Sequence, residues 1–142
     1  MSTLQESRFD RLLPLKSIGD ERGMLVAVEN GPDLPFAIER LFYIVGAGEA
    51  PRGLHAHREL HELLICAAGS CEVITDDGAK RTTYTLDRRD VGLHLAPMTW
   101  IETGAFTPDC VLLVLASAPF EEADYIRDYS SFLAAAAERA AL

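Results

Sequence analysis

Three residues of this sequence, His55, His57 and Glu62, have side chains and a spacing that suit chemistry. The two histidines lie in a β-compatible segment, residues 52–57, and successive side chains of a strand point to opposite faces. Both imidazoles are therefore expected on one face of one strand. Two imidazoles and a carboxylate that converge inside a β-barrel can hold a metal ion, or can act as general acids and bases. The residues alone leave both kinds of site open.

The length and composition indicate a globular protein with one domain over residues 1–142. Apolar residues make up 49% of the chain and charged residues 25%, and no apolar run reaches the roughly 18 residues that a membrane span needs. The N-terminal segment has neither the basic start nor the apolar core of a signal peptide. Cys66 and Cys71 flank a predicted tight turn and could lie near each other. The odd number of cysteines, three, favours a reduced, cytoplasmic protein without a disulfide.

The net charge of −9 argues against nucleic acid and anionic membranes as partners. It does not exclude a small anionic ligand, because a local group of arginines can outweigh a distant global field. The candidates for such a group are Arg22, Arg40, Arg52 and Arg58.

Short strands alternate with turn signals about every ten residues, which predicts an all-β sandwich or barrel rather than βαβ units. The expected strands cover residues 9–18, 24–28, 38–45, 62–66, 71–75, 82–86, 91–95 and 110–116. Residues 97–102 are expected to turn back toward the core. A short helix is expected from about residue 130, where Ser130 or Ser131 can cap an alanine-rich run. The N-terminal hairpin, up to about residue 30, is a candidate dimerisation arm.

The spacing of His55, His57, Glu62 and Gly69 resembles the first cupin motif, in which the two histidines and the glutamate commonly bind a metal ion. The second cupin motif ordinarily places a histidine five residues after a proline, and here that position is Glu102. A carboxylate can serve as a fourth ligand for zinc, iron or manganese. The missing histidine nevertheless weakens the metal interpretation.

Longer segments are similar to the sugar 3,4-ketoisomerases that act on dTDP-hexoses. The similarity extends from about residue 18 to residue 132, and its most specific parts are Arg-Gly-x-His-Ala-His at 52–57 and Asp-Tyr-Ile-Arg-x-Tyr at 124–129. The other similar segments are residues 35–44, 69–73, 76–78, 92–93, 97–100, 109–111 and 115–117. The resemblance implies a cupin-type jelly-roll β-barrel with a short C-terminal α-helix. It also implies a homodimer that moves the keto group of dTDP-4-dehydro-6-deoxyglucose from C4 to C3 without a metal ion or other cofactor.

In this interpretation His55 and His57 transfer protons, because a neutral imidazole can accept and donate a proton near pH 7. Tyr43 is the candidate donor to a sugar oxygen, so the predicted catalytic residues are His55, His57 and Tyr43. The predicted substrate-binding residues are Arg22, Arg40, Arg52, Glu62 and Trp100. The arginines suit a diphosphate, with Arg22 acting across the dimer, and Trp100 is a candidate for stacking on the sugar or base.

Two positions depart from the family pattern. Glu62 replaces a frequent glutamine, and Ile101 replaces a polar residue that is often histidine. Glu62 matches the metal-binding form of the first cupin motif. Ile101 removes a polar group from a position expected to face the sugar, so the configuration of the product at C4 stays open. Two alternative functions therefore remain. One is a metal-dependent cupin enzyme that uses His55, His57 and Glu62, and the other is a non-catalytic module that binds a nucleotide sugar.

Overall fold

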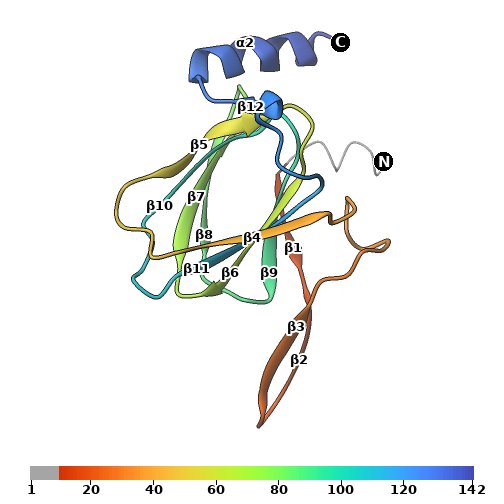
Figure 1. Cartoon of the computed structure of the whole chain (residues 1–142), viewed down its shortest axis with the longest axis vertical. Coiled ribbons are helices and arrows are strands. Elements are labelled where there is room, and N and C mark those ends of the chain that lie inside the picture. Colours follow the sequence, from red (N-terminus) through yellow and green to blue (C-terminus); the bar gives the residue numbers. More distant parts are fainter. Residues whose placement is uncertain (1–9) are drawn as a thin grey trace.

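The computed structural model describes residues 10–142, so Phe9, the first residue of the first predicted strand, lies outside the described part. Two antiparallel five-stranded sheets face each other and form the barrel (Figure 1). The first sheet contains, in spatial order, β1 (Arg11–Pro14), β9 (Val91–Leu95), β6 (Glu62–Ala68), β11 (Val111–Ala116) and β4 (Arg40–Val45). The second contains β12 (Tyr125–Ile126), β5 (Arg52–His57), β10 (Trp100–Gly104), β7 (Cys71–Asp76) and β8 (Arg81–Leu86). The predicted all-β jelly-roll class is confirmed.

The central strands β6 and β11 are apolar on both faces, which explains their nearly continuous hydrophobic runs. Toward the second sheet, Leu64 and Cys66 of β6 join the main core between the sheets. On the other face, Leu63 and Ile65 are covered by apolar side chains from the N-terminal third of the chain. The chain before β4 therefore forms part of the core, in addition to the hairpin that it contributes.

The N-terminal region forms two strands where one was predicted. β1 ends at Pro14, and β2 (Lys16–Asp20) leaves the barrel to pair with β3 (Gly23–Ala27). Proline has no N–H to donate to a strand ladder, which agrees with an end of pairing at this position. The β2–β3 hairpin projects from the barrel as a separate two-stranded sheet (Figure 1).

The strand β10 was not predicted, because residues 97–102 were expected to turn back toward the core. The turn ends at Thr99, and β10 then pairs with β5 on one side and with β7 on the other. Ile101 lies opposite His55 in this ladder, so the two side chains share the inner face of the second sheet. The missed strand is thus the neighbour of the histidine strand.

The predicted C-terminal helix is present as α2 (Tyr129–Ala140), but its N-cap is Asp128 and not a serine. The Asp128 carboxylate accepts hydrogen bonds from the backbone N–H and the hydroxyl of Ser131. Phe132 anchors the helix, since it is completely buried and packs with Trp100 and Ile126. The helix therefore lies across one end of the barrel, where it covers Trp100 and Ile126 at the edge of the second sheet (Figure 1). Within residues 10–142, no helix is long and apolar enough to cross a membrane.

Candidate active site

The strand β5 carries His55 and His57 on one face, as the period of two predicts, with their ring centroids 4.9 Å apart. The backbone before them is unusual, because Gly53 has a φ of 86° and Leu54 a φ of 43°. A Cβ atom at Gly53 would also lie 3.3 Å from the carbonyl oxygen of Ile101, so position 53 requires glycine. The Nδ1–H of His55 donates to the Gly53 carbonyl oxygen at 2.5 Å, which leaves its Nε2 as the basic nitrogen.

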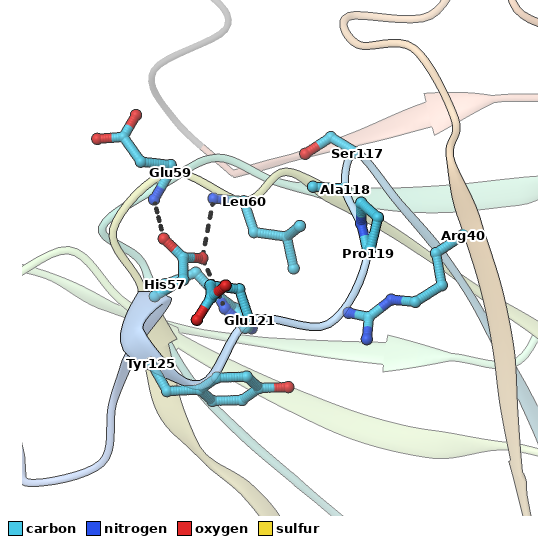
Figure 2. Close-up of a pocket in the computed structure, with 10 residues that line it drawn as sticks. Arg40, His57, Glu59, Leu60, Ser117, Ala118, Pro119, Glu121 and Tyr125 are labelled. Atoms are coloured by element: carbon cyan, nitrogen blue, oxygen red, sulfur yellow. Dashed lines mark hydrogen bonds and ion pairs between the residues drawn. The ribbon is translucent and has the colours of Figure 1, made fainter.

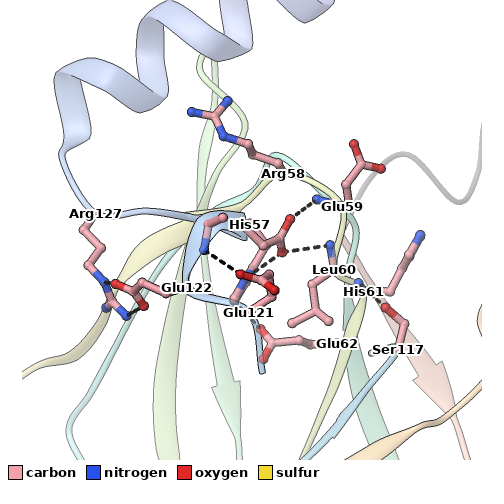
Figure 3. Close-up of polar contacts among 12 residues, drawn as sticks. His57, Arg58, Glu59, Leu60, His61, Glu62, Ser117, Glu121, Glu122 and Arg127 are labelled. Atoms are coloured by element: carbon pink, nitrogen blue, oxygen red, sulfur yellow. Dashed lines mark hydrogen bonds and ion pairs between the residues drawn. The ribbon is translucent and has the colours of Figure 1, made fainter. Parts of the chain in front are cut away.

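Asp124 fixes the orientation of His57. The Nδ1–H of His57 donates to Asp124 Oδ2 at 3.2 Å, and the same carboxylate accepts the backbone N–H groups of Glu59, at 2.8 Å, and Leu60, at 3.3 Å (Figure 3). Because the carboxylate can only accept, the His57 proton lies on Nδ1 and the lone pair on Nε2. This Nε2 is buried and has no hydrogen-bond partner among the described residues. His57 therefore presents an unpaired basic nitrogen inside the barrel.

The histidines are neutral near pH 7, because burial lowers the pKa of both. Burial and the neighbouring His55 together lower the pKa of His57 to about 4. Glu62 Oε1 lies 3.8 Å from His57 Nε2, but burial raises the pKa of Glu62 to about 7. The short approach is therefore not an ion pair between two fixed charges, because the lowered pKa of His57 and the raised pKa of Glu62 both favour the proton on Glu62.

The buried Glu62 carboxyl should make stability depend on pH. Its pKa is raised from 4.5 to about 7, so the unfolded chain loses this proton first as the pH rises. The free energy of unfolding therefore falls as the pH rises from 4.5 to about 7. Above pH 7 the loss of stability is complete and amounts to at most about 3 kcal/mol. We expect Glu62→Gln to be more stable than wild type at pH 8 and equal to it at pH 4. Urea unfolding at both pH values measures this, with the exposed Glu72→Gln as control. An equal gain at both pH values would contradict the assignment.

Tyr125 packs against both imidazoles from the neighbouring strand β12. Its ring centroid lies 5.0 Å from that of His55 and 4.4 Å from that of His57, and Tyr125 pairs with His57 in the ladder. The Arg127 guanidinium lies 4.1 Å from the Tyr125 ring centroid and pairs with Glu122. The segment η1 (Glu122–Asp124), β12 and the residue after β12 thus supply three further polar side chains to the site, those of Asp124, Tyr125 and Arg127.

A cavity of about 260 Å³ between the two sheets is lined by several of these side chains, among them His55, Glu62 and Tyr125. One wall consists of the second sheet and the residue after β12 and is mainly polar, with His55, Tyr125, Arg52, Thr103 and Arg127 beside the apolar Ile101. The facing wall belongs to the first sheet and is apolar apart from Glu62; it consists of Phe42, Ile44, Leu64, Leu112 and Val114. Ligand pockets generally combine an apolar lining with a few convergent polar groups.

A second pocket of about 260 Å³ shares Tyr125 with the first and is lined by His57 and Arg40 (Figure 2). In Figure 2 the Arg40 side chain reaches into this pocket from the side opposite His57 and Tyr125. The Arg40 guanidinium lies 5.1 Å from the Phe42 ring centroid, and its positive charge lowers the pKa of Glu62 against the larger effect of burial. Each pocket thus brings at least one guanidinium group to the histidine pair, Arg40 in one and Arg52 and Arg127 in the other.

Comparison with known proteins assigns the family. Residues 9–137 match the sequence model of the family described as "FdtA: WxcM-like, C-terminal". The chain belongs to this family. It is 47% identical over 124 residues to the TDP-4-oxo-6-deoxy-alpha-D-glucose-3,4-oxoisomerase of Aneurinibacillus thermoaerophilus, which covers 87% of this chain and 89% of that enzyme.

Solved structures agree with the FdtA family assignment. The sugar 3,4-ketoisomerase QdtA of Thermoanaerobacterium thermosaccharolyticum, solved in complex with TDP, is 38% identical with a TM-score of 0.89, over 92% of this chain and 96% of that one. The TDP-quinovose 3,4-ketoisomerase WlaRB of Campylobacter jejuni is 41% identical with a TM-score of 0.84, over 88% and 97% of the two chains.

For this member of the FdtA family, the structure brings together His55, His57, Glu62, Arg40 and Arg52. Arg52 is exposed and lines the cavity, whereas Arg40 lines the adjoining pocket. Arg22 is not near the site of its own chain. It lies at the tip of the β2–β3 hairpin, where it pairs with Asp20.

Tyr43 and Trp100 are not brought to the histidines. In β4 the residues Phe42 and Ile44 line the cavity, so Tyr43 between them points outward and is 62% exposed. Trp100 is 4% exposed on the outer face of the second sheet, beneath α2. It therefore cannot stack on a sugar inside the barrel. Tyr125 replaces Tyr43 as the candidate hydroxyl donor.

The proposed fourth metal ligand, Glu102, also lies on the outer face of the second sheet. It accepts a hydrogen bond from Trp100 Nε1 at 3.0 Å and pairs with Arg81 at 2.9 Å. Within residues 10–142, the donors that could share an ion here are those of His55, His57 and Glu62, which lie within 4.8 Å of one another. The four-ligand version of the metal hypothesis is therefore wrong, and a metal would have three protein ligands.

The prediction from sequence gave no role to Asp124, Tyr125 or Arg127. All three belong to the segment Asp-Tyr-Ile-Arg-x-Tyr, one of the two most specific family signals in the sequence. The motif itself is therefore the signal in the sequence that could have found them. Their role follows only from the pairing of β12 with β5.

Proposed function

We propose that this protein isomerises a dTDP-4-keto-6-deoxyhexose to its 3-keto form through an enediol intermediate, in deoxysugar biosynthesis. The observation that carries the proposal is the pair of imidazoles whose Nδ1–H groups are engaged by fixed acceptors. Their Nε2 atoms are left free of these hydrogen bonds, with His55 lining the cavity between the sheets and His57 the adjoining pocket. The related enzymes from Aneurinibacillus and Campylobacter, named as 3,4-oxoisomerase and 3,4-ketoisomerase, support the same reaction.

The reaction needs a base for the C3 proton, stabilisation of the enediolate, and an acid that delivers a proton to C4. Either imidazole can accept the C3 proton, because both are neutral near pH 7. The other imidazole can then take part in delivering a proton to C4. The negative charge of the enediolate needs donors where it develops. The Tyr125 hydroxyl and the Arg40 guanidinium are the candidates among the described residues, since both line the pocket beside His57.

The cavity accommodates only part of a dTDP-sugar. Its volume of about 260 Å³ is below the ~300–1,000 Å³ that encloses a drug-sized ligand. The sugar ring is therefore placed between the sheets, and the diphosphate next to the exposed guanidinium groups of Arg52 and Arg127 at the cavity wall. The complex of QdtA with TDP supports a thymidine diphosphate as the bound nucleotide.

Incubation with dTDP-4-dehydro-6-deoxyglucose, followed by NMR of the product, tests the function. The expected product is the 3-keto isomer, formed at an equal rate after treatment with a chelator. Loss of turnover on chelation and its return with zinc, iron or manganese would favour the metal-dependent alternative. Saturable binding of the sugar nucleotide without turnover would favour the non-catalytic module.

Arg52 should contribute to nucleotide affinity. We expect Arg52→Ala to weaken dTDP binding by about 1.5–3 kcal/mol, the scale of one charge-assisted hydrogen bond. Isothermal titration calorimetry measures this loss. Arg88→Ala is the matched control, because Arg88 is exposed and pairs with Asp90 in the turn between β8 and β9. Equal dTDP affinities for Arg52→Ala and wild type would remove Arg52 from the binding site.

We further propose a homodimer in which the β2–β3 hairpin contacts the second copy. Ile18 and Leu25 lie opposite each other on one face of the hairpin and are 61% and 60% exposed. Exposed apolar surface of this kind marks contact sites. Light scattering at micromolar concentration should give the mass of a dimer for the wild type and a monomer for Leu25→Glu. Ser17→Glu, on the other hairpin face, should remain dimeric, and a monomeric wild type would refute the proposal.

A further inference from the structure

The second chemical cluster of the molecule lies outside the active site and consists of the three cysteine thiols. The sulfur atoms of Cys66, Cys71 and Cys110 all lie within 4.8 Å of one another, and Cys66 Sγ and Cys110 Sγ are 3.7 Å apart. The three residues are 1%, 1% and 4% exposed, and all three are free thiols. Nothing in the proposed isomerase reaction uses them.

The fold places this cluster at the end of the barrel away from α2 and the histidines. Glu62, Leu64 and Cys66 share the inner face of β6, so Cys66 lies four residues, or about 13 Å along the strand, beyond Glu62. Cys71 begins β7, whose other end at Asp76 accepts a hydrogen bond from Tyr129 of α2. Cys71 and Cys66 therefore flank the β6–β7 turn at the lower end of the barrel in Figure 1.

The spacing of the sulfur atoms suits a single thiophilic ion. With metal–sulfur bonds of about 2.3 Å, three sulfur atoms on one ion lie roughly 3.7–4.0 Å from one another in tetrahedral to trigonal geometry. The 3.7 Å between Cys66 Sγ and Cys110 Sγ meets this spacing, and all three sulfur atoms lie within 4.8 Å of one another. Side-chain rotations that shorten a separation by at most about 1 Å bring all three sulfur atoms to a common centre.

The apolar residues around the three thiols favour an ion that forms a neutral complex with them. The cluster is packed by Leu64, Val73 and Leu112 in the main core, and burying an uncompensated charge there is costly. A zinc ion on three thiolates leaves a net charge of −1 and normally takes a fourth ligand. Among residues 10–142, no further histidine, cysteine or carboxylate joins the cluster. A trivalent ion on three thiolates is neutral and needs only three ligands.

We infer that Cys66, Cys71 and Cys110 form a binding site for a trivalent thiophilic ion of the arsenite class. Arsenous acid reacts by ligand exchange: three S–H bonds and three As–O bonds break, three As–S bonds form, and three water molecules leave. Arsenic remains trivalent, nothing is oxidised or reduced, and no net charge enters the core. The inference does not depend on the proposed isomerase function.

Entry to the site requires the opening of one loop contact. The turn after β6 and the loop before β11 are joined by two backbone-anchored hydrogen bonds, from Ser70 N–H to Thr107 Oγ1 at 2.9 Å and from Thr107 N–H to the Ser70 carbonyl at 3.0 Å. Cys110 N–H in turn donates to the Thr107 carbonyl at 3.0 Å. Thr107→Ala removes the side-chain bond and should accelerate arsenite binding without changing its stoichiometry.

The test is native mass spectrometry of the reduced full-length protein with arsenite, together with thermal unfolding. The expected result is one arsenic atom per chain with the loss of three protons, and a higher Tm. Cys71→Ala should weaken arsenite binding by more than about 100-fold, because loss of outer-shell partners alone costs 10–100-fold. Val73→Ala is the matched control, since it creates a cavity in the same core and keeps all three thiols.

Four results would overturn the inference, and three of them concern binding and stability directly. They are a folded wild type that binds no arsenic, a Cys71→Ala variant that binds arsenite as tightly as wild type, and a Tm that falls on addition of arsenite. The last would show that arsenite binds thiols only in the unfolded chain. Equal weakening in Val73→Ala and Cys71→Ala would likewise assign the effect to packing and remove the thiols as ligands.

Discussion

His55→Asn and His57→Asn are each expected to keep the fold and dTDP affinity while losing about 10²–10⁴-fold in turnover of dTDP-4-dehydro-6-deoxyglucose, the usual contribution of a positioned acid or base. Asparagine has no nitrogen that titrates near neutral pH, so it can neither remove the C3 proton nor return one to C4. Both histidines lie on one face of β5 with their ring centroids 4.9 Å apart, His55 lining the cavity between the sheets and His57 the adjoining pocket.

Exchange of the C3 proton in deuterated solvent separates the two roles. The variant that lacks the C3 base should show no exchange, whereas the other should exchange deuterium into the substrate without completing the isomerisation. His61→Asn is the control, because His61 stacks on His94 outside the cavity and should retain wild-type turnover. Near wild-type rates in both site variants would show that the histidines only bind or pack.

Asp124→Asn is expected to lower kcat by about 10²-fold with little change in dTDP affinity. The amide can still accept the His57 Nδ1–H, but it removes the negative charge that stabilises the imidazolium. Asp124 raises the pKa of His57 against the larger effects of burial and of His55, so its removal should lower that pKa further. The acid side of the kcat/KM profile should therefore shift to lower pH.

The pH profile distinguishes positioning from folding. Asp124 also accepts the backbone N–H groups of Glu59 and Leu60, so a variant that merely loosens this loop would lose stability without moving the acid limb. Asp124→Glu keeps the charge and should recover part of kcat. An unshifted profile in Asp124→Asn, together with wild-type kcat, would exclude Asp124 as the residue that orients His57.

Local patterns in the sequence were sufficient for the histidine pair and for the fold class. The period of two along β5 placed His55 and His57 on one face, and regular turn signals indicated a barrel. The same patterns could not place Tyr43, because β4 carries large apolar or aromatic residues on both faces. Which face turns inward depends on its pairing with β11, a strand almost 70 residues later.

The remaining site residues depended on contacts between distant parts of the chain. Trp100 looked available for stacking because nothing in its own segment shows that α2 covers it. Asp124 lies 67 residues after His57, and their contact exists because the two-residue strand β12 pairs with the end of β5. Such contacts follow from tertiary packing, which overrides local propensity.

The unlike walls of the cavity have a stereochemical consequence. The proton-carrying groups His55 and Tyr125 belong to one sheet, while the facing sheet offers hydrocarbon apart from Glu62, which lies beside His57. Ile101, opposite His55 in the ladder, carries no proton either. A ring bound between these walls meets His55 and Tyr125 on one of its faces and, apart from Glu62, hydrocarbon on the other. Removal at C3 and delivery at C4 are then suprafacial, and the configuration of the new centre is set by which face of the sugar the apolar wall shields.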